Sequence, residues 1–440
     1  MDKQLLDLIK QAGVVGAGGA GFPTHAKLNC EPEYVIANCA ECEPLIKSDK
    51  HLMEMYAADI VAGMETALKI TGAKEGVIAV KHKNKNAVAN LEIALSGKKN
   101  IRLHLLENYY PAGDEQQIIY EVTKRVVKVG QIPISAGCVV INGQTLYHVA
   151  QAVQGKPVIS RMVTVNGAVN NPITVEAPIG TPVTYLIEKA GGVNISDYVV
   201  VLGGPLMGRV SDNVANEFVT KTTNGILVLP KDNELIGLKT MDLNQQLQIA
   251  KSACCNCSMC TMICPRNNLG LGVQPHKVMQ ALTLNNSDLI VDPNVALGCC
   301  NCGLCTYVGC NMGLTPGRFV AQVRGALLAK KVKATKDPGR VNLFRDEAKA
   351  PSHRVIQRMG LTKYDIDVPY AELDQPRAVR VMLKQHIGAP CSPLVGNGDM
   401  VTAGQMVGNV AEGALGAPVH ASISGKVVAV TGEYVDIMKA

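Results

Sequence analysis

The sequence has no stretch approaching the ~20 consecutive apolar residues that a helix needs to cross a bilayer, so it predicts no membrane span. It also has no strong excess of charge. A formal net charge of +6 over 440 residues is too diffuse to indicate nucleic-acid binding, although it could favour an anionic ligand or an acidic partner. The amino-terminal MDKQLLDLIKQAG has no long apolar core behind its charges, which is typical of an amphipathic helix and not of a signal peptide. These absences predict a cytoplasmic protein.

Changes of composition along the chain indicate several domains, as the length predicts. Residues 1–155 alternate helical patterns with short β-rich runs, which predicts an α/β domain. Short strands, one helix and glycine turns over 156–238 are typical of a β-grasp-like module, and 239–335 is helical around a cysteine block. We expect a charged, proline-containing linker over 336–375 and a small β-barrel or sandwich over 376–440.

Cysteine is the most informative residue type, because ten of the 15 cysteines lie between Cys254 and Cys310. A secreted disulfide scaffold would be short and rich in cysteine throughout, whereas a long chain with one dense block indicates metal binding. The first run, C-x2-C-x2-C-x3-C followed by Pro265, has the spacing of bacterial ferredoxins. The second run departs from it, because one more residue precedes Cys310 and Asn311 replaces the proline.

These two runs predict two [4Fe–4S] clusters, in which each loop supplies three thiolates and lends its fourth cysteine to the other cluster. One cluster would take Cys254, Cys257, Cys260 and Cys310, and the other Cys299, Cys302, Cys305 and Cys264. Cys255 and Cys300 are interpreted as non-ligands. The alternative is a pair of zinc ribbons, but zinc sites usually use two separated C-x2-C knuckles and not three thiolates on one tight loop.

A glycine-rich segment near the amino terminus could hold a phosphate. Gly16-Ala-Gly18-Gly19-Ala-Gly21 matches G-x-G-x-x-G, but it follows a helical pattern and not a strand, so an ordinary dinucleotide-binding fold is not expected. Its backbone N–H groups and the charge of Lys27 suit a phosphate, and the alternative is a glycine turn without a ligand.

An acidic loop follows, in which NCAECEP places Asn38, Glu41 and Glu43 after a predicted strand. The alternatives are a solvated acidic turn or a further metal site of irregular spacing, built from Cys30, Cys39 and Cys42.

Together, GAGGAGFPTHAKL and NCAECEP resemble the flavin-binding domain that the NADH-oxidising subunit of respiratory complex I shares with the RnfC protein of the Rnf complex. The order of modules is similar to that of the PduS-type cobalamin reductases of bacterial microcompartments, whereas the RnfC protein has its barrel at the amino terminus. The resemblance implies a multidomain α/β and α+β fold. Its parts would be a complex-I-type FMN-binding α/β domain, an SLBB β-grasp module, a helical two-[4Fe–4S] ferredoxin insert and a C-terminal barrel-sandwich hybrid.

The same resemblance implies roles for individual residues. The phosphate and ribityl of FMN would be surrounded by Gly16, Gly18, Gly19, Gly21 and Lys27, with Asn142 and Thr145 at the phosphate end. The isoalloxazine and nicotinamide side would be lined by Asn38, Glu41 and Glu43. In YYPAGDEQQ, Tyr110 would stack on a base or nicotinamide beside Gly113, and Glu115 would flank the flavin. Glu41 and Glu115 are therefore the predicted catalytic residues.

The implied activity is that of an NADH-dependent oxidoreductase. NADH would give a hydride to FMN, and single electrons would pass through the clusters to cob(III)alamin or cob(II)alamin for an adenosylcobalamin-dependent enzyme in a microcompartment. An adenosyltransferase or a shell protein would be a further partner. Two alternatives stay open: an Rnf-like electron adaptor that feeds a ferredoxin or another reductase without a corrin, and a non-catalytic scaffold that binds a partner or a corrinoid.

The C-terminal module also resembles biotinyl and lipoyl carrier domains, which present a lysine on a hairpin. His420-Ala-Ser422 occupies that region without a lysine, so no swinging-arm cofactor is expected. His386 and His420 are candidate metal or corrin ligands, although a lone histidine in a β-module is more often a hydrogen bonder.

Overall fold

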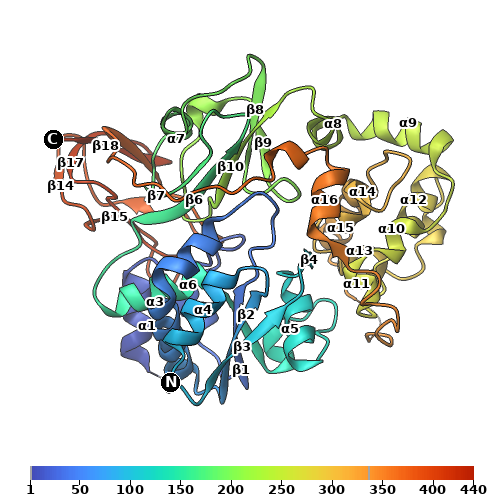
Figure 1. Cartoon of the computed structure of the whole chain (residues 1–440), viewed down its shortest axis with the longest axis horizontal. Coiled ribbons are helices and arrows are strands. Elements are labelled where there is room, and N and C mark those ends of the chain that lie inside the picture. The colour runs from blue at the N-terminus through green and yellow to red at the C-terminus, as the bar shows by residue number, and fades with distance from the viewer. Residues whose placement is uncertain (1, 335–336) are drawn as a thin grey trace.

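The computed structural model describes residues 2–334 and 337–440. In Figure 1 an α/β domain lies at the bottom of the view, a β-rich module stands above it, a helical region lies to the right and a small barrel lies to the left. None of the helices in the described ranges is long and apolar enough to cross a membrane.

The amino-terminal domain is built on a parallel sheet in the order β3-β2-β1-β5. Its elements are α1 (Lys3–Gln11), α2 (Thr24–Lys27), β1 (Tyr34–Cys39), α3 (Ser48–Thr71), β2 (Glu75–Lys81), α4 (Lys85–Ala94), β3 (Ile101–Leu106), α5 (Glu115–Thr123), β5 (Cys138–Asn142) and α6 (Gly143–Val153). Successive residues of a strand face opposite sides of the sheet. Val35 and Ala37 of β1 therefore pack with α3 and α6, while Ile36 packs with α5 on the other face.

The winding of this sheet changes direction between β1 and β5. From β1 the chain adds β2 and β3 on one side, and β5 then pairs with the free side of β1. Asn38 and Asn142 pair in register at the carboxyl ends of these two strands. In open parallel sheets, ligands bind outside the carboxyl ends of the strands at such a switch point, so a ligand cavity is expected at this edge.

The β-rich module is a mixed sheet in the order β7-β6-β10-β8-β9, with β10 parallel to β6 and antiparallel to β8. Its elements are β6 (Ser160–Gly167), β7 (Ile173–Pro178), α7 (Val183–Lys189), β8 (Tyr198–Leu202), β9 (Arg209–Ser211) and β10 (Gly225–Pro230). Val200 and Leu227 of the sheet share one core with Leu186 of α7. Leu45 and Ile46 of the first domain enter the same core, so the two domains are packed together.

The cysteine block lies in the helical region. Its helices are α8 (Glu234–Thr240), α9 (Leu243–Ala253), α10 (Met259–Met262), α11 (Pro265–Asn268), α12 (Pro275–Thr283), α13 (Asn294–Leu297), α14 (Leu304–Tyr307) and α15 (Pro316–Ala329). Ala250, Val278 and Phe319, from three of the longer helices, form a small core. The short helices α10 and α14 follow directly on the two cysteine loops.

The carboxyl-terminal barrel has its own core, which includes Val381, Val407 and Ile437. Its strands are β12 (Ala378–Met382), β13 (Ser392–Pro393), β14 (Met400–Val401), β15 (Met406–Asn409), β16 (Val419–His420), β17 (Gly425–Val430) and β18 (Tyr434–Lys439). The barrel touches the first domain, because the backbone N–H of Ile387 donates to the Ala20 carbonyl at 3.1 Å.

The segment predicted as a linker over 336–375 is corrected by the structure, which describes it from residue 337. Within it, β11 (Ala350–Pro351) pairs with β4 (Tyr109–Tyr110), and α16 (Ser352–Arg358) follows. Val355 and Leu361 are fully buried in the core of the β-rich module. The charges that suggested a solvated linker are paired instead: Arg345 bonds to Glu121 at 2.7 Å and is only 6% exposed.

Candidate functional site

A cavity of about 430 Å³ opens where the carboxyl ends of β1 and β5 meet. Each residue predicted to bind FMN or to act in catalysis lines it: Gly16, Gly18, Gly19, Gly21, Lys27, Asn38, Glu41, Glu43, Tyr110, Gly113, Glu115, Asn142 and Thr145. The structure thus brings together positions from distant parts of the sequence in one cavity, which we name the flavin cavity. Their individual contacts with FMN stay predictions.

The glycine loop forms one wall of the flavin cavity and is held in place from behind. The Ala17 N–H donates to Thr145 Oγ1 at 2.9 Å. Gly21 has a φ of 74°, and a Cβ there would stand 3.0 Å from the Cα of His386. At Gly19, by contrast, a Cβ would meet no atom of the described residues within 4 Å. The loop is therefore tightly backed at Gly21 and open at Gly19, which leaves its backbone accessible to a ligand.

The polar groups of the flavin cavity suit a phosphate-bearing cofactor. Thr24 Oγ1 is buried and has no hydrogen-bond partner in the described part of the chain. A buried polar atom left unpaired costs about 1–3 kcal/mol, so a ligand oxygen at this position would be stabilising. Lys27 Nζ lies 3.3 Å from Glu115 Oε1 at the same end of the cavity. The cavity volume also lies within the ~300–1,000 Å³ typical of cofactor sites.

Glu41 closes the first turn of α3. The backbone at Glu41 has a φ of 41°, and Oε1 accepts the N–H groups of Asp49 at 2.9 Å and Lys50 at 3.2 Å. Burial, together with the neighbouring Asp49 carboxylate, raises the pKa of Glu41 to about 7. Glu41 thus lines the cavity as a helix-capping carboxyl, and its catalytic role stays a prediction.

Tyr110 and Glu43 connect the flavin cavity to the other domains. The Tyr110 hydroxyl lies 2.8 Å from the Cys302 carbonyl and 3.2 Å from Glu43 Oε1, and either oxygen can accept its proton. Glu43 Oε2 accepts the Leu206 N–H of the β-rich module at 2.9 Å. A Cβ at Gly204 would collide with the Glu43 side chain, so only glycine fits there. Burial raises the pKa of Glu43.

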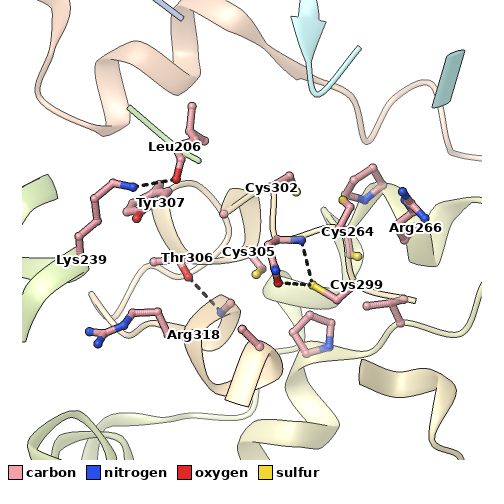
Figure 2. Close-up of a pocket in the computed structure, with 18 of the residues that line it drawn as sticks. Leu206, Lys239, Cys264, Arg266, Cys299, Cys302, Cys305, Thr306, Tyr307 and Arg318 are labelled. Carbon is pink, nitrogen blue, oxygen red and sulfur yellow. Dashed lines mark hydrogen bonds between the residues drawn. The ribbon is translucent and has the colours of Figure 1, made fainter. Parts of the chain in front are cut away.

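A second cavity, of about 410 Å³, contains cysteines from both runs. Its wall includes Cys264, Cys299, Cys302 and Cys305. Figure 2 shows the sulfur atoms of Cys264, Cys299 and Cys305 turned toward a common space. Cys300 and Cys302 line both this cavity and the flavin cavity, so the two cavities share a wall.

A third and smaller cavity contains the other cysteines of the predicted clusters: Cys254, Cys257, Cys260 and Cys310. Cys310 therefore lies with the first run and Cys264 with the second, in the arrangement that crossed ligation needs. Burial raises the pKa of Cys260 and of Cys264 to about 12, so these thiols need a metal to lose their protons near neutral pH. The ligand assignment stays a prediction.

The spacing of these thiols suits a cluster better than a single ion. Among the described residues, no three His, Cys, Asp or Glu side chains are placed to hold one metal ion. Thiolates around a four-iron cubane stand farther apart than those around one zinc ion, because each sulfur binds a different iron. The zinc-ribbon alternative therefore has no support in the described residues.

The remaining candidate ligands have ordinary structural partners. Cys39 is buried in the core beneath α3, whereas the sulfurs of Cys30 and Cys42 bond to backbone groups of different segments. The ring of His386 accepts the Ala417 N–H at 3.0 Å through Nε2. Burial lowers the pKa of His420 to about 3. These environments favour the structural alternatives for all five residues.

Two buried charged residues of the flavin cavity were missed by the sequence reasoning. Asp49 Oδ2 accepts a hydrogen bond from Asn142 at 3.2 Å, and Arg161 donates to the Ala17 carbonyl at 2.8 Å. Asp49 carries no motif, because it is one of several charged residues at the start of a helix. Arg161 did carry a signal: a charged residue within an otherwise apolar strand is rare without a partner.

Comparison with known proteins accounts for the whole architecture. Family models match in chain order: the Nuo51 FMN-binding domain over residues 9–151, the SLBB domain over 162–210, the 4Fe-4S dicluster domain over 253–315 and the RnfC barrel sandwich hybrid domain over 362–439. Cobalamin reductase PduS of Salmonella typhimurium (strain LT2) is 39% identical over 442 residues, which span 99% of this chain and 96% of the relative. The chain belongs to the PduS family.

Two further relatives define the limits of this likeness. Cobalamin reductase PduS of Citrobacter freundii is 39% identical over 436 residues, spanning 98% of this chain and 95% of the relative. One protein of the Na(+)-translocating ferredoxin:NAD(+) oxidoreductase complex of Acetobacterium woodii is 36% identical over 264 residues, but these span only 59% of this chain and 57% of that relative. For this member of the PduS family, the predicted multidomain fold with FMN and two [4Fe–4S] clusters as cofactors is therefore confirmed.

Proposed function

We propose that this chain is an NADH-dependent cobalamin reductase, which passes electrons from NADH to cob(III)alamin or cob(II)alamin. Both relatives that match nearly its whole length carry the name cobalamin reductase. The observation that carries the proposal is the wall of Cys300 and Cys302 that separates the flavin cavity from the cavity of Cys264. Redox groups on the two sides of one such wall are close enough to exchange electrons without a diffusing carrier.

The residues of the flavin cavity would hold and orient the reactants. When bound, FMN takes a hydride and passes electrons on one at a time, which matches the one-electron capacity of each cluster. Lys27 and the open backbone at Gly19 would bind its phosphate. Asn38 donates to the Gly113 carbonyl at 2.8 Å, which fixes the loop on the opposite wall. This geometry positions the reactants, and positioning is what hydride transfer mainly requires.

The two cysteine cavities differ in their distance from the flavin cavity along this route. We name the site of Cys264, Cys299, Cys302 and Cys305 the proximal cluster site, because it shares the wall. The site of Cys254, Cys257, Cys260 and Cys310 is the distal cluster site. Cys257 is exposed, so the acceptor would meet the protein at the distal site. Transfer of the reduced corrinoid to an adenosyltransferase, and a shell protein as partner inside a microcompartment, are further parts of this proposal.

Anaerobic purification followed by NADH titration tests the proposal. We expect about eight irons and about one FMN per chain, bleaching at ~450 nm on addition of NADH, and steady reduction of cob(III)alamin. Reduction of a ferredoxin without any corrinoid reduction would support the Rnf-like adaptor instead. Clusters without NADH-dependent bleaching would leave only the scaffold.

A further inference from the structure

An ion pair crosses the boundary between the flavin cavity and the proximal cluster site. Arg266 donates to both carboxylate oxygens of Asp114, from Nε at 2.8 Å and from Nη2 at 2.6 Å. The two side chains are only 14% and 8% exposed, respectively. Solvent therefore screens this pair much less than a surface pair, and the bidentate geometry fixes its direction.

Both partners are held by elements that belong to the two cavities. Asp114 caps α5 by accepting the Gln117 N–H at 3.3 Å, and α5 begins at Glu115 of the flavin cavity. Arg266 lies in α11, two residues after Cys264. Gln117 Nε2 also donates to the Pro265 carbonyl at 2.9 Å, beside the ion pair. The charges are therefore fixed relative to the flavin on one side and to a predicted cluster ligand on the other.

The pair has a defined polarity. Within the described ranges, Arg266 lines the proximal cluster site and not the flavin cavity, whereas Asp114 lines the flavin cavity and not the proximal site. Figure 2 shows Arg266 beside Cys264. We propose that the Arg266–Asp114 pair is an oriented dipole that sets the direction of electron flow, from the flavin to the proximal cluster. Arg266 and Asp114 act here as positioning residues, since neither touches a reacting atom.

The sign of the effect follows from electrostatics. One electron leaves the flavin and one arrives on the cluster, so the cluster side gains negative charge. A positive charge on that side stabilises the added electron, and a negative charge on the flavin side destabilises an electron there. Lys239 and Arg318 also line the proximal site, across from Arg266, and Glu43 lines the flavin cavity.

The other charges at the two cavities are neutralised locally. On the flavin side Lys27 is paired with Glu115, and on the cluster side Arg209 is paired with Glu217. Burial lowers the pKa of Arg161, and the nearby Asp49 carboxylate balances its charge and acts against this lowering. The unbalanced charges thus share the polarity of the Arg266–Asp114 pair.

Redox titrations of Arg266→Gln and Asp114→Asn test this inference, which rests on the proposed function because it needs both redox groups. EPR would follow the clusters, and absorbance would follow the flavin. For Arg266→Gln we expect a proximal potential shifted in the negative direction, with about a tenfold change in the ratio of reduced to oxidised cluster at a fixed potential, which is 59 mV for one electron. For Asp114→Asn we expect a flavin potential shifted in the positive direction by a similar factor.

Controls separate the dipole from simple docking. Arg266→Lys keeps the charge and should keep the proximal potential, and it replaces Arg266→Gln if that variant does not assemble. The wave of the distal cluster, identified as the one removed by Cys257→Ala, should not move in any of these variants. Shifts of the same sign in Arg266→Gln and Asp114→Asn, or no shift in variants with full iron and FMN, would overturn the dipole. Wild-type protein without clusters or flavin would overturn the proposed function instead.

Discussion

At the scale of single residues, Glu41 shows how a site residue can serve the fold as well. Its carboxylate caps α3 by accepting two backbone N–H groups, yet the same side chain lines the flavin cavity. A capping carboxylate is stabilised by the positive end of the helix, whereas burial penalises its charge. At Glu41 burial is the larger effect, because the pKa is raised to about 7.

The raised pKa of Glu41 predicts a dependence of stability on pH. A carboxyl with a raised pKa in the folded state contributes full stability below its unfolded pKa of 4.5 and loses it as the pH rises through about 7. We expect Glu41→Gln to gain in free energy of unfolding relative to wild type over this window, by at most ~3 kcal/mol. Melting temperatures of the two FMN-free proteins between pH 5 and pH 8 measure this. A difference that does not change with pH would show that Glu41 titrates normally.

At the scale of elements, the glycine loop depends on the carboxyl-terminal barrel. Ile387 donates to Ala20, and Gly21 packs against His386, so a segment near the end of the chain supports a loop near its beginning. The sequence predicted the loop, the cavity residues and the order of the modules, because each is recorded in local residue patterns. It could not predict this support, since a contact between distant segments leaves no spacing to detect. The same limit explains Arg345, whose charge suggested solvent until its partner Glu121 was seen.

This support predicts different effects at two neighbouring glycines. Gly21→Ala forces a side chain into a φ of 74° and against His386, so we expect a loss of roughly 1–3 kcal/mol in stability together with weaker FMN binding. Gly19→Ala meets no atom of the described residues within 4 Å, so its melting temperature should match wild type. We expect FMN affinity to fall in both variants, since a methyl group at Gly19 would occupy ligand space. Calorimetric unfolding and fluorescence titration with FMN measure the two effects. Equal melting temperatures for both variants would contradict the support by the barrel.

At the scale of the whole molecule, the cavities lie in series along one route. The flavin cavity shares a wall with the proximal cluster site, and the proximal and distal sites each contain one cysteine from the other run. Crossing of the fourth ligand ties the two loops together, so neither cluster site can form without the other loop. The sequence predicted this crossing from the ferredoxin spacing. It did not predict which cluster faces the flavin, because that depends on how the domains pack.

Two double variants test the crossed arrangement against ligation within each run. If Cys254 and Cys310 share a cluster, Cys254→Ala/Cys310→Ala removes two ligands from the distal site and leaves the proximal one complete, with about four irons per chain. Cys254→Ala/Cys264→Ala would then remove one ligand from each site, so both clusters are damaged and neither EPR wave keeps its wild-type potential. Ligation within each run predicts the reverse, because Cys254 and Cys264 would then belong to the same cluster. Iron analysis and EPR on anaerobic protein therefore decide between the two arrangements, and one intact cluster in Cys254→Ala/Cys264→Ala would refute the crossed one.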